Sequence, residues 1–143
     1  MERKRKKDKI NKLIKKLEGF FRKEKNILTV YLFGSYGTED QTELSDIDIA
    51  ILFADTVSML EELGIAAEIE FILKQGQIDL LNLNKTSVIL QHRVISTGEK
   101  IFERDSLTTA DFIENTLKFY FDYGLVYKKF RDDFREELRG GIS

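Results

Sequence analysis

Three carboxylates in two apolar segments are the residues of this chain with the clearest potential for chemistry. Asp46 and Asp48 stand two residues apart in a segment that continues to Phe53, so in a β-strand both side chains leave the same face. Asp79 stands near the start of a second apolar segment, at 78–83. Oxygen ligands of this kind suit Mg²⁺, which also shares substrate phosphates. If the two segments form neighbouring strands, the three carboxylates can hold two metal ions for in-line phosphoryl displacement.

A glycine-serine pair, Gly34-Ser35, precedes these aspartates, and ten residues separate Ser35 from Asp46. Glycine lets the backbone adopt a positive φ and approach a ligand closely. Ser35 offers a hydroxyl and a backbone N–H to a phosphate oxygen, and the N-terminus of a following short helix would add a favourable partial charge. Each motif taken alone has a simpler explanation. Gly34-Ser35 can be an ordinary turn, and the aspartates can be solvated residues at the ends of strands. Their order beside strands predicts a site for a nucleotide and Mg²⁺.

The segments around these residues have the patterns of a small mixed β-sheet flanked by helices, an α/β or α+β domain. Short apolar segments rich in β-branched residues predict strands, and apolar residues at three- and four-residue steps predict helices. The expected order is a helix over 10–21, strands over 27–33 and 46–53, a helix over 57–74, a strand over 78–83, a helix over 86–98 and a short edge strand over 100–104. Residues 46–53 should form a central strand, because they are apolar almost throughout. The polar residues 38–45 predict a loop or a short helical turn.

A long final helix is expected from Thr109 to Leu138, with Thr108 as its cap and Asp111 placed as in a capping box. Six aromatic residues recur along it at three- and four-residue steps or their multiples and form one stripe: Phe112, Phe119, Tyr123, Tyr127, Phe130 and Phe134. Packing against the sheet is the simpler interpretation. However, the stripe is longer than a three-strand sheet can cover, so its far half is also a candidate partner surface.

The length of 143 residues predicts one domain over 1–143, with a basic amphipathic N-terminal helix over 1–25, a catalytic core over 26–104 and a C-terminal helix over 107–139. The chain has no cysteine, which excludes disulfides and thiolate metal sites. Its charged start lacks the apolar block of a signal peptide, and no apolar run is long enough to span a membrane. We therefore expect a cytoplasmic protein without a membrane segment.

Charge is unevenly distributed along the chain. Residues 1–25 hold 12 Lys and Arg against 4 Asp and Glu, whereas the remainder holds 11 against 21. A basic segment on an acidic body is compatible with a nucleic-acid or acidic-protein partner, but also with a solvated helix face. No aromatic residues alternate with these bases, so protein contact ranks above nucleic acid. His92 is the only histidine, and a structural or solvated role is expected for it.

The combination of Gly34-Ser35, Asp46-Ile47-Asp48 and a later Asp79 resembles the polymerase-β-like nucleotidyltransferase superfamily. Its short length and ten-residue spacing are similar to the minimal nucleotidyltransferases, the MNT antitoxins that are paired with HEPN-domain toxins. The motifs cover residues 26–83, and the general helix layout covers 87–139.

The resemblance implies a polymerase-β-like core that transfers AMP from ATP to an acceptor hydroxyl and releases pyrophosphate. It implies that Gly34 and Ser35 bind the triphosphate, that Asp46 and Asp48 hold both Mg²⁺ ions, and that Asp79 holds the catalytic metal and helps to deprotonate the acceptor. In the MNT family this acceptor is a tyrosine of the HEPN toxin, and its modification silences the RNase.

One departure from the family pattern concerns the residues after Ser35. Many relatives carry an arginine there, whereas this chain has the acids Glu39 and Asp40. Less positive charge is therefore available beside the expected phosphate site. This leaves open an antitoxin that neutralises its HEPN partner by contact alone, or a nucleotidyltransferase acting on a small molecule or an RNA end.

Overall fold

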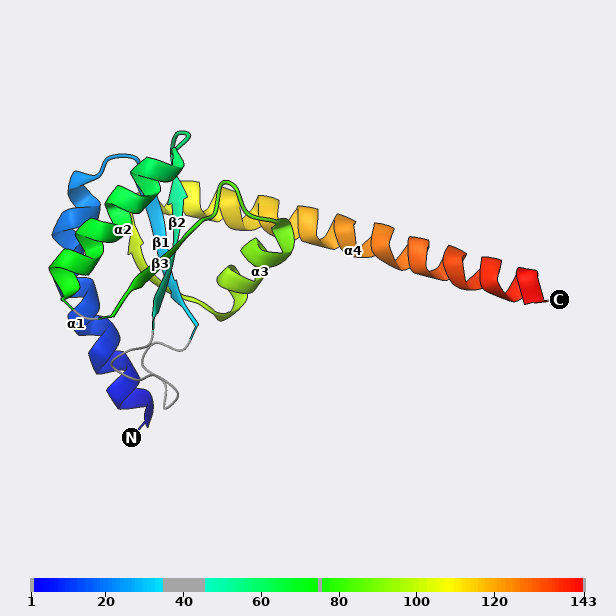
Figure 1. Cartoon of the computed structure of the whole chain (residues 1–143), viewed down its shortest axis with the longest axis horizontal. Helices are drawn as coiled ribbons and strands as arrows, with labels where there is room; N and C mark the ends of the chain where they lie inside the picture. Colours follow the sequence, from blue (N-terminus) through cyan, green and yellow to red (C-terminus); the bar gives the residue numbers. More distant parts are fainter. Residues whose placement is uncertain (1, 35–45, 75, 143) are drawn as a thin grey trace.

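The computed structural model describes residues 2–34, 46–74 and 76–142 of the chain (Figure 1). Four helices and four strands follow one another in these residues: α1 (Glu2–Lys23), β1 (Ile27–Phe33), β2 (Ile47–Phe53), α2 (Met59–Leu73), β3 (Ile78–Asn82), α3 (Val88–Thr97), β4 (Glu99–Glu103) and α4 (Ser106–Ile142). The expected elements are thus confirmed in type and order. The loop expected over 38–45 lies outside the described residues.

The four strands form one mixed sheet in the order β3-β2-β1-β4. β2 pairs with β1 in antiparallel and with β3 in parallel orientation, while β4 pairs antiparallel with the other side of β1. The predicted central position of β2 and edge position of β4 are both confirmed. β2 and β3 are parallel because α2 carries the chain back across the sheet between them, as a crossover connection must.

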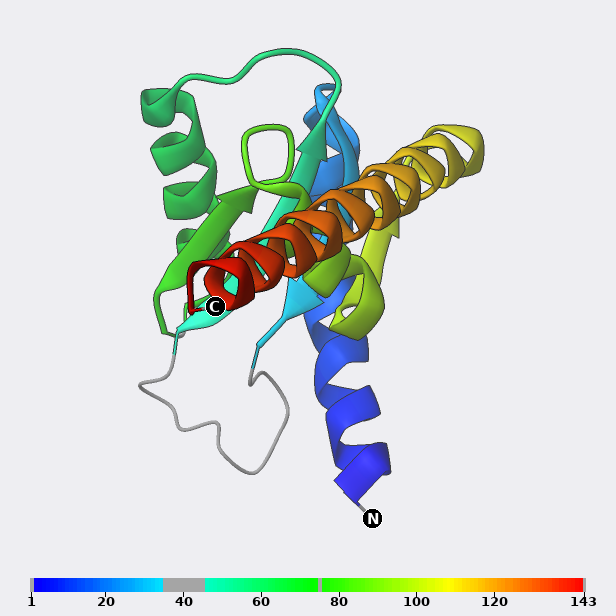
Figure 2. The same ribbon diagram turned by 90° about the vertical axis from the view of Figure 1, so that its right-hand side faces the viewer.

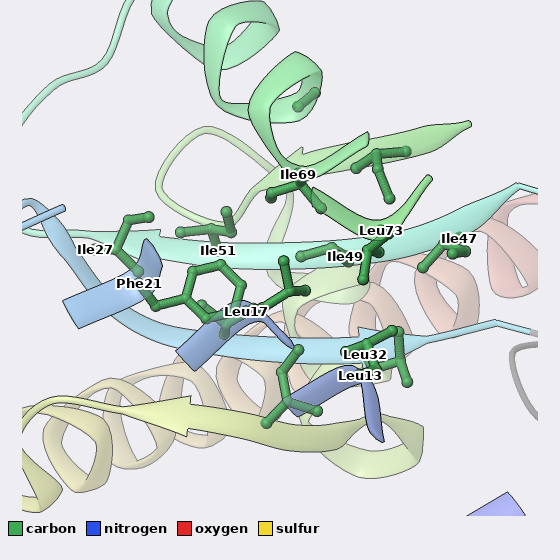
Figure 3. Close-up of a cluster of buried hydrophobic side chains, with 14 of the residues drawn as sticks. Leu13, Leu17, Phe21, Ile27, Leu32, Ile47, Ile49, Ile51, Ile69 and Leu73 are labelled. Atoms are coloured by element: carbon green, nitrogen blue, oxygen red, sulfur yellow. The ribbon is translucent and has the colours of Figure 1, made fainter. Parts of the chain in front are cut away.

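Helices α1 and α2 cover one face of the sheet, and α3 and the first turns of α4 cover the other (Figures 1 and 2). The first face holds the larger core, in which Leu17 and Phe21 of α1 pack with Ile49 and Ile51 of β2 and Ile69 of α2 (Figure 3). Each such side chain contributes roughly 1.5–3 kcal/mol by leaving water. This core fixes which face of β2 points inward.

The second face holds a smaller cluster that includes Tyr31, Leu52 and Val94. Gly98 ends α3 beside it, as the sequence predicts, but with an ordinary φ of −81°. Glycine is required there by close packing, because a Cβ would lie 2.6 Å from the carbonyl oxygen of Val94. His92 has a packing role on this side, since its ring stacks on that of Tyr120 with the ring centroids 3.7 Å apart.

The apolar residues that predict α2 are mostly on its exposed side. Leu60, Leu63 and Phe71 are 80%, 60% and 77% exposed, whereas Ala66 and Ile69 are buried against the sheet. The helix is apolar on nearly all sides, so its periodicity identifies a helix without identifying the inward face.

The final helix begins earlier than expected. Asp105 rather than Thr108 provides the N-terminal contacts, because its carboxylate accepts hydrogen bonds from the Leu107 N–H (3.2 Å) and from the Thr108 hydroxyl (2.7 Å). Thr109 is buried, and its hydroxyl lies 2.8 Å from that of Thr29 on β1. This contact fixes the start of α4 against the sheet.

Core packing of the whole aromatic stripe, the simpler interpretation of the sequence, is wrong. Phe112 packs on the second face, but every residue from 117 to 140 is exposed, and α4 extends far beyond the body (Figure 1).

No helix among the described residues is long and apolar enough to span a membrane.

Arg104 joins three parts of the fold that are distant in sequence. Its guanidinium donates hydrogen bonds to the carbonyl oxygens of Phe21 (2.6 Å) and Glu24 (3.0 Å) at the end of α1, and of Ile27 (2.8 Å) on β1. Since a hydrogen bond from a charged group contributes about 1.5–3 kcal/mol, we expect Arg104→Ala to lower the free energy of unfolding by about 2 kcal/mol.

Chemical denaturation of the two proteins measures this difference. Arg22→Ala is the matched control, because the Arg22 side chain forms an exposed ion pair with Glu18, which contributes about 0.5 kcal/mol or less, and the backbone carbonyl that accepts from Arg104 is kept. Equal stability of the Arg104 and Arg22 variants would show that the carbonyl contacts contribute no net stability.

Candidate active site

Asp48 and Asp79 lie side by side on the two parallel strands at the centre of the sheet. The register pairs Asp48 of β2 with Asp79 of β3, and pairs Asp48 with Phe33 of β1 on its other side. Neighbouring strands are about 4.8 Å apart, so the two carboxylates leave the same face at adjacent positions. The prediction that residue 79 completes a cluster with β2 depends on this register.

Asp46 directly precedes β2 and is exposed, whereas Asp48 is half-buried. Between and after them, Ile47 and Ile49 are 1% and 0% exposed in the core on the opposite face, as the alternation of a strand requires (Figure 3). The apolar residues therefore hold β2 in place, and the two aspartates are free for chemistry on the other face.

Asp46 and Asp79 act electrostatically on Asp48. The pKa of Asp48 is raised from its ordinary value, first by partial burial and then by the negative charges of Asp79 and Asp46. A cation at this edge would relieve both the repulsion and the cost of desolvation. The charges thus favour an ion of the kind that the sequence predicts.

Gly34 lies against the carboxylate of Asp48. Its φ is +82°, and a Cβ at this position would lie 2.2 Å from Oδ2 of Asp48. Only glycine fits there, because a side chain would displace the carboxylate and the left-handed backbone would be strained. The structure therefore places Gly34, Asp46, Asp48 and Asp79 at one end of the sheet, where β1 ends and β2 and β3 begin. Ser35 follows Gly34 in sequence but lies outside the described residues.

The donor set at this edge fits Mg²⁺ in its chemistry. All three candidate ligands are hard carboxylate oxygens, and the missing Cβ of Gly34 lets the carboxylate of Asp48 lie directly against the turn that follows β1. Within residues 2–34, 46–74 and 76–142, no three acidic or histidine side chains already converge as a metal-binding group. Asp46 and Asp79 are exposed and repel Asp48, so their convergence would require the cation and the substrate phosphates.

Glu70 is a residue of this region that sequence reasoning missed. Its carboxylate accepts a hydrogen bond from the backbone N–H of Ile78 (2.9 Å), while the Ile47 N–H donates to the carbonyl of Gln77 (2.8 Å). These two contacts hold the start of β3, and with it Asp79, beside the start of β2. Nothing in the spacing of Glu70 distinguishes it from the other glutamates of α2.

A mixed sheet with two aspartates at its central strand, a third on the parallel neighbour and a glycine turn against them defines a nucleotidyltransferase core. The chain belongs to the polymerase β nucleotidyltransferase family, whose profile matches residues 15–107.

A named relative is similar to part of this chain. A protein of Shewanella oneidensis named protein adenylyltransferase MntA is 35% identical over 92 residues, which span 64% of this chain and 63% of that protein. The match thus spans less than two thirds of that curated relative.

Two solved structures have the same fold. A toxin-antitoxin structure with AMP-PNP is 28% identical with a TM-score of 0.67, and the match covers 87% of this chain and 96% of that chain. A structure of the tri-AMPylated Shewanella oneidensis HEPN toxin in complex with its MNT antitoxin is 27% identical with a TM-score of 0.65, covering 90% and 97%.

Proposed function

We propose that this chain is a Mg²⁺-dependent protein adenylyltransferase of the cytoplasm that acts as an antitoxin. It transfers AMP from ATP to a hydroxyl, a tyrosine by the family pattern, of a HEPN-domain RNase. The observation that carries the proposal is the cross-strand register of Asp48 and Asp79 with Gly34 packed against Asp48. Adenylyl transfer needs carboxylates grouped in this way beside a turn that nucleotide phosphates can approach.

The relatives support the choice of substrate and partner. One similar protein is named as a protein adenylyltransferase, and similar structures contain AMP-PNP or an AMPylated HEPN toxin. An acceptor that is a protein also accounts for the large exposed apolar area of α4, which a small-molecule acceptor would leave unexplained.

The reaction assigns a role to each residue of the site. The acceptor oxygen forms a bond to the α-phosphorus of ATP, the bond from that phosphorus to the bridging oxygen breaks, and pyrophosphate leaves. Gly34 and Ser35 bind the triphosphate through the backbone and the Ser35 hydroxyl. Asp46, Asp48 and Asp79 would hold Mg²⁺ beside the phosphates, and Asp79 would help to deprotonate the acceptor hydroxyl. Bound Mg²⁺ supplies charge neutralisation for the phosphates.

A contact-only antitoxin is the second candidate. No Arg or Lys directly follows Ser35, and the aromatic stripe of α4 is exposed. Both features favour an antitoxin that acts by contact alone. In that case the carboxylates would be dispensable for neutralisation of the toxin.

Intact-mass spectrometry distinguishes the two candidates. A candidate HEPN-domain partner is incubated with this chain, ATP and Mg²⁺, and an Asp46→Asn variant is tested in parallel. A partner heavier by one or more AMP units, only with the intact site, is the expected result. An unchanged mass together with a stable complex would favour the contact-only antitoxin. An unchanged mass without a complex would overturn both.

A further inference from the structure

The distal half of α4 carries an aromatic surface that no described part of the chain covers. We define the distal face by the five aromatic residues of the stripe beyond the body: Phe119, Tyr123, Tyr127, Phe130 and Phe134, which are between 47% and 68% exposed. Their rings stack along the helix in pairs, with centroids 6.4 Å apart for Tyr123 and Tyr127 and 6.5 Å for Phe130 and Phe134. Aromatic residues ordered in this way are typical anchors of protein interfaces.

The distal face continues the side of α4 that packs on the body. Thr109, Phe112 and Thr116 face the sheet and α3, and steps of three or four residues lead from them to Phe119 and Tyr123. Tyr120 contacts the body by stacking on His92 of α3. A partner bound to the distal face would therefore lie on the same side of α4 as α3.

This side is also the side of the carboxylates. Asp48 leaves β2 on the face that α3 and α4 cover, since Ile47 and Ile49 occupy the opposite core. Figures 1 and 2 show α4 projecting away from this face, so that the body and the helix enclose a wide angle. A protein seated in that angle contacts the distal face and is directed toward the end of the sheet with Asp48 and Asp79.

The charges beside the distal face argue against a second copy of this chain as the occupant. Arg131 and Arg135 border it on one side, and Asp122 and Asp133 on the other. In an antiparallel pair of α4 helices, the border with Arg131 and Arg135 would meet the same border of the other copy, and these positive charges would repel. In a parallel pair, the second helix would enter the space that α3 already occupies.

We propose that the distal face of α4 is the docking surface for the acceptor protein and holds that protein on the carboxylate side of the sheet. The inference rests on the proposed function for the identity of the acceptor. The occupant that fits is a helical protein with an apolar groove between helices, into which α4 lays its aromatic side chains. Acidic residues on the groove edge beside Arg131 and Arg135 would fix the direction of α4.

The test measures docking without chemistry. The affinity of this chain for the HEPN-domain partner that the intact-mass experiment identifies is measured by calorimetry in the absence of ATP. We expect Phe130→Glu with Phe134→Glu to weaken binding by about 100-fold or more, because hot-spot aromatics are lost and two charges enter the groove. The matched control is Phe121→Glu with Leu125→Glu, which changes two residues of similar exposure on the opposite side of α4.

A second readout separates this proposal from the proposed function. The variant at Phe130 and Phe134 should raise the KM for the partner with little change in kcat, and it should bind nucleotide as the unmodified chain does. Asp48→Asn should lose transfer but retain docking, so a failure of catalysis alone leaves the docking result standing.

Three results would overturn the docking proposal. The first is wild-type affinity in the Phe130 and Phe134 variant, or an equal loss in the control. The second is loss of the folded body in that variant, measured by circular dichroism, which would make the stripe part of the core. The third is a dimer of the isolated chain that the variant converts to a monomer.

Discussion

Asp48→Asn is expected to reduce adenylyl transfer by on the order of 1000-fold or more while leaving the chain folded. The side chain keeps its shape, but the charge that would balance a cation and the nucleotide phosphates at the centre of the site is lost. Asp46→Asn should have the same kind of effect. Transfer is measured as AMP added to the HEPN partner per unit time, with Asp111→Asn on the exposed surface of α4 as the matched control.

The same substitution should make the chain more stable near neutral pH. Partial burial, and then the negative charges of Asp79 and Asp46, raise the pKa of Asp48 in the folded state, so the ionised carboxylate is less favourable there than in the unfolded chain. Replacing it by asparagine removes the repulsion, which for cross-strand neighbours amounts to roughly 0.2–1 kcal/mol.

The pH dependence has a definite sign. A carboxyl with a raised folded pKa lowers stability above that pKa, and the penalty disappears below its unfolded pKa, where the group is protonated in both states. The stability advantage of Asp48→Asn should therefore shrink as the pH falls into the acidic range. An advantage that is absent at neutral pH would show that the three carboxylates do not interact. Retained transfer in both aspartate variants would instead exclude the proposed chemistry.

The strands and the candidate site follow from local sequence for identifiable reasons. β1 and β2 are short, apolar and β-branched, and their boundaries are confirmed to within one residue. A strand-helix-strand unit implies that β3 is parallel to a strand of the same sheet, but the pairing of Asp48 with Asp79 is known from the register of the structure. Residue spacing thus brings Gly34, Asp46 and Asp48 to one edge, and the register of β3 adds Asp79.

Contacts between segments distant in sequence could not be predicted in the same way. The carbonyl contacts of Arg104 span about eighty residues of chain, and the contact of Glu70 with Ile78 depends on where α2 ends relative to β3. The sequence predicts that the final helix starts at Thr109, whereas α4 starts at Ser106, because Asp105 lies ahead of the periodic apolar residues and accepts hydrogen bonds from the first turn.

The exposed apolar sides of α2 and α4 could not be predicted from the sequence, and the physical reason is the same for both helices. Periodicity reports that a helix has an apolar face, but not whether the same chain covers it. For α2 the covered side is that of Ile69, and Leu60 and Phe71 face solvent. For α4 the periodicity is regular throughout, but the body ends near Tyr120 and the helix continues.

Gly34→Ala is expected to reduce transfer by about 100-fold or more and to destabilise the fold by about 1–3 kcal/mol. The new Cβ would lie 2.2 Å from Asp48 Oδ2, so the carboxylate must move, and the φ of +82° strains any residue with a side chain. Denaturation and transfer assays measure the two effects. Gly64→Ala is the control, because its Cβ would meet nothing within 4 Å, and alanine in a helix should stabilise by roughly 0.5–1 kcal/mol.

A double-mutant cycle separates the clash from the backbone strain. In an Asp48→Ala background the carboxylate is absent, so Gly34→Ala should cost only the strain of its φ, and the difference between the two backgrounds measures the contact. A contact energy near zero would mean that the carboxylate of Asp48 moves aside without cost. The close approach of Gly34 would then have no bearing on the position of Asp48, and the site would depend on the register of β2 and β3 alone. We expect instead a positive contact energy, because Asp79 and Phe33 flank Asp48 on the neighbouring strands and limit where its carboxylate can go.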